Sequence, residues 1–404
     1  MPPAEPYLDF AALSIDSNIL RGQRYNFDGG ILKQLEQFQG SPVQIVQPDV
    51  IHSEGVQHLS AEIAEALRAA RGNLRTLSKY SEDITISEFG ASHLCDINPT
   101  VMAEDKLKTF YKRINGHVIA SSRVNISELM RMYFSTEAPF ETSNEKKHEF
   151  PDAIALLTLE SWAVGNDRRT VLVSKDKGWH AFAKRSSYLH VVEDLPDALA
   201  LFQPHTKVKS LIEMLQADGL LDRDSELFQG IKNAILEQVS EQTPNIEANS
   251  LFYFESDDVQ IEYLGHKFAQ GEDNKPKIRI VLIEDDLVVL SLTALVNTKV
   301  MTTFSFSQYD SIDKDYVQLG GAVEERNESY ETEVLIHFKG DWKELGNAHI
   351  PNEIEVEGEM DVVKFGDIAP DYSSDRDEQL RWEWEWEWEQ EKERRRDEAV
   401  ASKR

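Results

Sequence analysis

The chain of 404 residues contains a single cysteine, Cys95. One cysteine excludes an internal disulfide framework and any zinc site built from several cysteines. The chain also lacks an apolar run of the roughly twenty residues that a membrane-spanning helix needs. Residues 1–20 lack the basic start and apolar segment of a signal peptide. From these absences we expect a cytoplasmic protein with no membrane partner.

Two further absences exclude common enzyme classes. The sequence has no Gly-rich phosphate loop of the Walker type, which argues against a P-loop nucleotide hydrolase. It has no Gly-x-Ser-x-Gly nucleophile elbow either, which argues against an α/β-hydrolase.

Basic residues are scarce, with 43 Lys and Arg against 72 Asp and Glu and a net charge of -29 at pH 7. Affinity for nucleic acids comes largely from basic side chains, so this balance disfavours a chain that binds nucleic acid along its whole length. The excess of acidic residues is uneven along the chain. Residues 1–200 hold 21 Lys and Arg against 27 Asp and Glu, a net charge of -6, which leaves -23 for residues 201–404. The N-terminal half therefore remains compatible with a nucleic-acid substrate.

The length and the hydrophobic fraction of 41% predict more than one folded core. Residues 8–203 alternate short apolar runs with amphipathic segments, which is typical of an α/β domain with a central parallel sheet. Residues 204–247 indicate a helical connector. Residues 248–368 show period-two segments between charged turns, which predicts a β-rich domain of the antiparallel sandwich or barrel type.

The individual elements follow from the periodicity of apolar residues. In the N-terminal domain we expect strands at residues 10–20, 43–46, 170–174 and 188–192 and helices at residues 48–71, 150–162 and 180–184. In the connector we expect helices at residues 208–216 and 227–239. In the β-rich domain we expect strands at residues 251–254, 259–263, 278–283, 287–296, 300–306, 316–319, 332–338 and 354–363.

The tail, residues 369–404, is charged and contains four tryptophans alternating with glutamates over residues 381–389. Alternate positions share one face of a strand, whereas on a helix the tryptophans form two i, i+4 pairs. Three interpretations stay open: packing against the β-rich domain or a second copy, a motif that binds a protein partner, and a repetitive tail without fixed structure.

Four acids stand beside predicted element ends in the N-terminal domain. Asp16 and Asp176 each follow a strand, Glu54 lies on the helix after the second strand, and Asp152 lies in the first turn of a helix. Ligands of open parallel sheets bind beyond the carboxyl ends of strands, so we expect these acids to converge. Clustered carboxylates repel one another and usually hold a cation. Oxygen ligands without thiolates favour Mg²⁺ or Mn²⁺ over zinc.

Four segments in this order resemble the motifs of the PIN domain family. Residues 15–20 (Ile-Asp-Ser-Asn-Ile-Leu) resemble its opening motif, and residues 48–54 (Pro-Asp-Val-Ile-His-Ser-Glu) are similar to the helix bearing its glutamate. Residues 150–155 (Phe-Pro-Asp-Ala-Ile-Ala) are similar to the helix bearing its third acid. Residues 173–176 (Val-Ser-Lys-Asp) resemble its last strand end. The resemblance covers about half of the chain.

The resemblance implies a Rossmann-like three-layer fold around a central parallel sheet. It implies a Mg²⁺- or Mn²⁺-dependent endoribonuclease, with RNA as the favoured substrate. The implied catalytic residues and metal ligands are Asp16, Glu54, Asp152 and Asp176. Two supporting residues would orient them, Asn18 and Ser174.

Two alternatives remain open beside the ribonuclease. The substrate could be DNA, because flap-cleaving nucleases have related acidic sites. The domain could instead be a non-catalytic PIN-like fold, with the acidic C-terminal half as a surface for a protein partner or a second copy. The large C-terminal module also suggests a toxin or phage-defence setting, an inference from architecture alone.

Overall fold

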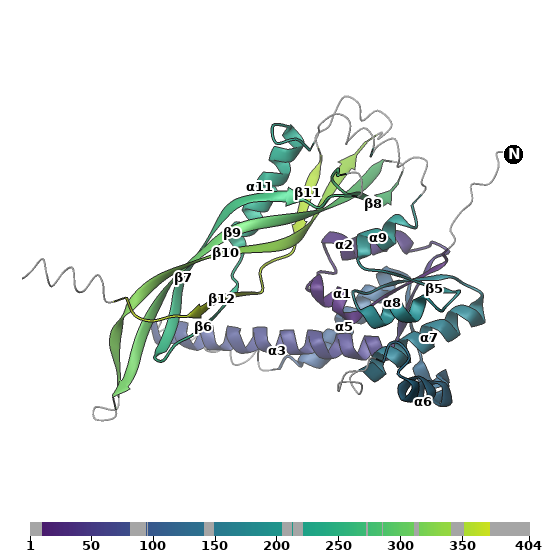
Figure 1. Ribbon diagram of the computed structural model, residues 1–404, viewed down its shortest axis with the longest axis horizontal. Helices are drawn as coiled ribbons and strands as arrows, with labels where there is room; N and C mark the ends of the chain where they lie inside the picture. The colour runs from purple at the N-terminus through teal and green to yellow at the C-terminus, as the bar shows by residue number, and fades with distance from the viewer. Residues whose placement is uncertain are drawn as a thin grey trace, which may run out of the picture. The chain divides into compact units, whose positions relative to one another are not determined.

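The computed structural model describes residues 10–80, 94, 96–140, 149–203, 212, 221–271, 274–284, 286–310, 315–340 and 351–371 (Figure 1). The chain divides into two compact units. Unit 1 comprises Met1–Ala234, Phe268–Ala294 and Thr332–Gly358. Unit 2 comprises Ile235–Lys267, Leu295–Glu331 and Glu359–Arg404.

A five-stranded parallel sheet forms the centre of the N-terminal part of unit 1. Its strands are β1 (Ala12–Ile15), β2 (Gln44–Pro48), β3 (Gly116–Ile119), β4 (Thr170–Val173) and β5 (Leu189–Val192). The order is β3-β2-β1-β4-β5, and every neighbouring pair is parallel. The strand order reverses between β1 and β4, so the carboxyl ends of these two strands form the switch point where ligands bind in open α/β sheets. The predicted α/β fold with a parallel sheet is confirmed.

Helices flank this sheet and follow it along the chain (Figure 1). Their bounds are α1 (Ser17–Gly22), α2 (Gly30–Lys33), η1 (Gln34–Phe38), α3 (Asp49–Tyr80), α5 (Pro99–Arg113), η2 (Ser121–Arg123), α6 (Ile126–Ser135), α7 (Phe150–Asn166), α8 (Lys177–Ala183) and α9 (Leu195–Ala200). A further helix, α11 (Glu226–Glu241), precedes the strands of the C-terminal half. Among the described residues, none of these helices has the length and apolar character required to cross a bilayer.

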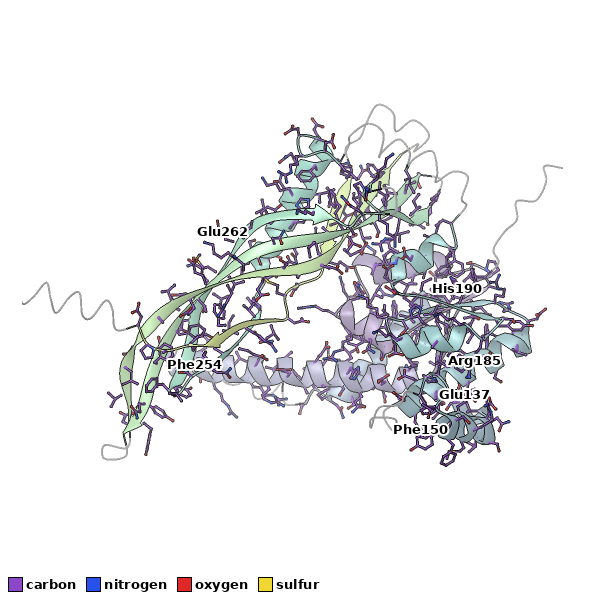
Figure 2. All side chains as sticks on the ribbon, in the orientation of Figure 1. Glu137, Phe150, Arg185, His190, Phe254 and Glu262 are labelled. Atoms are coloured by element: carbon purple, nitrogen blue, oxygen red, sulfur yellow. The ribbon has the colours of Figure 1, made fainter. Side chains whose placement is uncertain are left out.

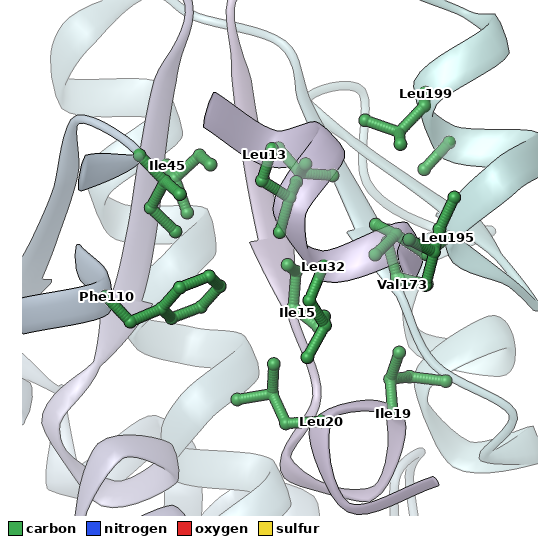
Figure 3. Close-up of a cluster of buried hydrophobic side chains, with 14 of the residues drawn as sticks. Leu13, Ile15, Ile19, Leu20, Leu32, Ile45, Phe110, Val173, Leu195 and Leu199 are labelled. Atoms are coloured by element: carbon green, nitrogen blue, oxygen red, sulfur yellow. The ribbon is translucent and has the colours of Figure 1, made fainter. Parts of the chain in front are cut away.

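The alternation of side chains along the strands produces a core on each face of the parallel sheet. Leu13 of β1 belongs to the first core, with Phe110 of α5 and Leu195 of α9. Figure 3 shows these side chains converging. Ala12 of β1 and Leu172 of β4 belong to the second core, which includes buried residues of α6, α7 and α8. The two cores fix the strand ends that carry the acids.

The helix α3 is longer than predicted. The sequence predicted an end at Gly72, but α3 continues to Tyr80. Among the residues that the structure describes, no atom lies within 4 Å of the position that a Cβ of Gly72 would take. A single glycine costs a helix interior only about 1 kcal/mol, which the flanking turns offset.

The C-terminal half is β-rich, as predicted. Its strands are β6 (Asn245–Asn249), β7 (Tyr253–Phe268), β8 (Ile278–Ile283), β9 (Leu287–Asp310), β10 (Asp315–Lys339), β11 (Glu353–Glu357) and β12 (Val362–Asp367). One sheet has the order β11-β10-β9-β7, with β8 paired to β9, and β12 pairs with β6 in a second sheet. The β10–β11 and β8–β9 pairs are antiparallel, whereas β12 and β6 are parallel.

Several predicted strand boundaries in this half were wrong. The pairs of strands predicted at 251–254 and 259–263, 287–296 and 300–306, and 316–319 and 332–338 are single long strands, β7, β9 and β10, while the predicted strand 354–363 is divided into β11 and β12. Polar residues that resembled turns lie inside these strands. Thr298, for example, is buried in β9, and its hydroxyl donates to the Glu328 carbonyl of β10 at 3.3 Å. The predicted helix 208–216, apart from residue 212, and the Trp/Glu segment of the tail lie outside the described residues.

Candidate active site

The four predicted acids come from four helices of the N-terminal part of unit 1. Asp16 directly follows β1 and is the N-cap of α1. Asp176 follows β4 by three residues and is the N-cap of α8. Asp152 lies in the first turn of α7, and Glu54 lies on α3, which begins where β2 ends. Because β1 and β4 are neighbours, their two acids come from the switch point of the sheet.

Local chemistry explains why these aspartates begin helices. A carboxylate at the N-cap accepts hydrogen bonds from the free backbone N–H groups of the first turn. Asp16 accepts from the Asn18 N–H at 3.4 Å. Asp176 accepts from the N–H groups of Gly178 and Trp179 at 2.7 and 3.1 Å. Each cap occupies the Oδ1 atom and fixes the carboxylate at the strand end.

Two serine hydroxyls connect three of the acids. Ser174 donates from Oγ to Oδ2 of Asp16 at 2.7 Å and accepts from the backbone N–H of Asp176 at 3.1 Å. Ser17 donates from Oγ to Oε2 of Glu54 at 2.8 Å, and the same hydroxyl lies 3.4 Å from Oδ1 of Asp16. Both serines are fully buried. Hydrogen bonds therefore link Glu54, Asp16 and Asp176 in one continuous chain.

Trp179 extends the chain to the fourth acid. Its indole Nε1 donates to Oδ1 of Asp152 at 2.9 Å, while its backbone N–H donates to Asp176. The Trp179 side chain has no exposed surface, so its orientation is fixed by packing. One residue thus ties the first turn of α7 to the first turn of α8.

The segment that contains Glu137 and Pro139 packs against the loop that carries Asp176. A Cβ added to Gly178 would lie 2.9 Å from Cβ of Pro139, so the approach of this segment requires glycine. The segment is held by Glu137, which accepts from Arg185 at 2.9 Å, and Figure 2 labels both residues. Gly178 is therefore a structural requirement of the loop that carries Asp176.

Burial gives two of the acids an unusual protonation equilibrium. Asp16 is 2% exposed, and its burial raises the pKa above the ordinary aspartate value, although hydrogen bonds from Ser174 and Asn18 oppose the shift. Burial raises the pKa of Asp152 to about 7, against the opposing hydrogen bond from Trp179. The charges of the other acids add to both shifts. Asp16 and Asp152 are therefore both affected by neighbouring carboxylates, and a cation would relieve that repulsion.

The donor set fits Mg²⁺ or Mn²⁺, because it consists of carboxylate and hydroxyl oxygens without thiolates. No three of the four acids bring carboxylate oxygens within 4.8 Å of one another; within the described residues that spacing occurs elsewhere, at His337, Glu353 and Glu355. Mg²⁺ usually keeps several waters and takes one or two direct carboxylates. A spread set of acids joined by hydroxyl groups is compatible with that coordination.

The structure brings all four predicted acids and Ser174 into one hydrogen-bonded region. Asn18 has an exposed side chain and donates its backbone N–H to Asp16, and the supporting role of its side chain stays a prediction. Two of the three connecting residues, Ser17 and Trp179, had no role predicted from the sequence. Ser17 stood inside the opening motif, and Trp179 followed the last motif by three residues.

Comparison with known proteins gives one result. A family model described as a PIN domain matches residues 13–179, a range that includes all four acids and ends at Trp179. PIN domains are generally metal-dependent nucleases. Neither the search of curated proteins nor that of solved structures gives a significant match.

Proposed function

We infer, from the PIN domain that residues 13–179 form, that this chain is a metal-dependent nuclease, and we propose RNA as its substrate. Asp16, Glu54, Asp152 and Asp176 are the proposed metal ligands and catalytic residues. The observation that carries the proposal is the hydrogen-bonded chain from Glu54 through Asp16 and Asp176 to Asp152.

The free-energy cost of burying Asp16 and Asp152 supports a role in binding a cation. Burying a carboxylate without a cationic partner is unfavourable, and the shifts of Asp16 and Asp152 show that cost. Both carboxylates bond to neutral donors among the described residues: Ser174, Ser17 and the Asn18 N–H for Asp16, and Trp179 for Asp152. A purely structural role would be served better by apolar side chains of similar size.

Bound Mg²⁺ or Mn²⁺ would lower the pKa of a water and offset charge on the phosphate. The residues of this chain supply the orientation. Ser174 holds Oδ2 of Asp16 on the β4 side, and Trp179 holds Oδ1 of Asp152, so the carboxylates lose little freedom when a metal and substrate arrive. Burial of Asp16 also keeps bulk water away from its side chain.

The surface beside the site is compatible with an anionic substrate. Lys175 and Lys177 flank Asp176 and are both exposed. Exposed lysines at this place can contact a phosphate backbone and displace its counterions. Lys146 and Lys147, the other basic pair near the acids in sequence, lie outside the described residues.

The test is cleavage of end-labelled single-stranded RNA and DNA of the same sequence, by the full chain with Mg²⁺, Mn²⁺ or EDTA. The variants are Asp16→Asn and Asp152→Asn. The matched control is Glu65→Gln, an exposed acid three turns along α3 from Glu54. We expect metal-dependent cleavage of RNA, retained by Glu65→Gln and reduced by roughly 100-fold or more in both site variants.

The outcomes separate the alternatives. Cleavage of DNA but not RNA would keep the nuclease and replace its substrate. Equal activity in wild type and both site variants would indicate a contaminating nuclease. Absence of cleavage together with absence of Mn²⁺ binding would contradict the enzyme and support the non-catalytic interaction module.

A further inference from the structure

A second group of metal-binding side chains lies on the β10–β11 ladder of unit 1. His337 of β10 is the register partner of Glu353 of β11, and Glu355 follows two residues later. Side chains two residues apart share a strand face, so both glutamates lie on the same side of β11. One ligand atom from each of the three residues lies within 4.8 Å of the others. None of these residues belongs to the four-acid site.

The imidazole of His337 is the buried member of this group. Its side chain is only 9% exposed, and Nε2 lies 2.9 Å from Oε1 of Glu355. Nε2 is thus paired with a carboxylate of the same group of residues. Two ligands about 2.1 Å from a tetrahedral Zn²⁺ stand about 3.4 Å apart, so the two side chains need to separate by only about half an ångström to share an ion.

Glu355 is also held from its other side. Its Oε2 accepts from the backbone N–H of Gly30, the first residue of α2, at 2.8 Å. Such a bond fixes the carboxylate plane and leaves Oε1 directed toward His337. The ligand set is therefore partly preorganised, with an exposed glutamate, Glu353, completing it from the solvent side.

We propose that His337, Glu353 and Glu355 form a second metal site, selective for Zn²⁺ or a similar transition-metal ion over Mg²⁺. A mixed set of one imidazole and two carboxylates suits Zn²⁺, whereas Mg²⁺ prefers oxygen ligands alone. Three protein ligands leave a fourth position for water or another group. A bound ion would connect β11 to β10 and fix the Glu355 side chain, which also bonds to Gly30 of α2. Metal binding would therefore stabilise unit 1.

The test is titration of the metal-free full chain with Zn²⁺ in excess Mg²⁺, read by competition with a chromophoric chelator. Glu353→Gln removes the exposed ligand without disturbing the buried imidazole. Glu284→Gln, an exposed acid of the same unit, is the matched control. We expect wild type and Glu284→Gln to bind equally, and Glu353→Gln to bind at least about 10-fold more weakly. Bound Co²⁺ should give a visible absorption band that is lost with His337→Asn.

Equal Zn²⁺ affinity and stoichiometry in wild type and Glu353→Gln would overturn the proposal. A Co²⁺ band unchanged by His337→Asn would overturn it as well, provided that circular dichroism shows a folded variant. If that variant is unfolded, the Glu353→Gln comparison decides alone. The result does not depend on the four-acid site, because both proteins in the comparison retain it.

Discussion

Replacing Ser174 with alanine tests whether one hydroxyl organises the acids. The Ser174 hydroxyl donates to Asp16 at 2.7 Å and accepts from the Asp176 N–H at 3.1 Å, with no exposed surface. The change leaves a buried carboxylate oxygen and a backbone N–H without that partner. Hydrogen bonds to charged groups contribute about 1.5–3 kcal/mol, so we expect a loss of about 2 kcal/mol in unfolding free energy. Mn²⁺ affinity should fall about 10-fold, because Asp16 loses the donor that favours its charged form.

Ser14 provides the matched control for this variant. It lies on β1, is also fully buried, and its hydroxyl has no hydrogen-bond partner among the described residues. Ser14→Ala removes the same atom but no hydrogen bond, so we expect an unchanged or slightly higher stability and unchanged Mn²⁺ affinity.

The assay is urea unfolding in EDTA for wild type and both variants, followed by Mn²⁺ titration of the folded proteins. Comparison of midpoints at equal slope isolates the change in stability. Equal destabilisation by both substitutions would refute the reasoning, because it would show that volume and not hydrogen bonding matters. Unchanged Mn²⁺ affinity in Ser174→Ala would show that the Ser174 hydroxyl does not contribute to metal binding.

Three further predictions concern other residues. Gly30→Ala should lower the unfolding free energy by about 2 kcal/mol, since Gly30 has a φ of 56° and an added Cβ would lie 1.5 Å from Oε1 of Glu357; an unchanged urea midpoint would contradict this. Burial raises the pKa of Glu333 from 4.5 to about 7, so wild-type stability should fall as pH rises through this window, and Glu333→Gln should remove up to about 3 kcal/mol of that fall; parallel stability profiles from pH 4.5 to 8 would refute it. Trp179→Phe removes the donor to Asp152 and should weaken Mn²⁺ binding about 10-fold, measured by titration, and equal affinity would count against the positioning role.

The N-terminal fold followed from local sequence signals. The strand predicted at residues 170–174 is β4, but the strand predicted at residues 10–20 was too long, because Asp16 caps a helix and the chain continues as α1 from Ser17 after β1 ends at Ile15. Neighbouring parallel strands have their carboxyl ends at the same edge of the sheet. The sequence alone therefore predicted that acids distant in sequence lie close together. The helix α7, which carries Asp152, was also found from its Pro start and apolar pattern.

The connections between the acids could not be found this way. Trp179 reaches Asp152 across 27 positions, and no periodic pattern encodes a contact between two helix starts. The bounds of the long strands β7, β9 and β10 were predicted wrongly for a related reason. Thr298 looks like a turn residue locally, yet its hydroxyl bonds to the carbonyl of Glu328 on the next strand, and cross-strand pairing outweighs local propensity.

The most direct test of the central claim is the initial rate of RNA cleavage as a function of Mn²⁺ concentration for wild type, Asp16→Asn and Glu65→Gln. The account predicts rates that rise and saturate with Mn²⁺ for wild type and Glu65→Gln, vanish in EDTA, and fall about 100-fold or more in Asp16→Asn. Cleavage by Asp16→Asn at the wild-type rate and with the same Mn²⁺ dependence would contradict it.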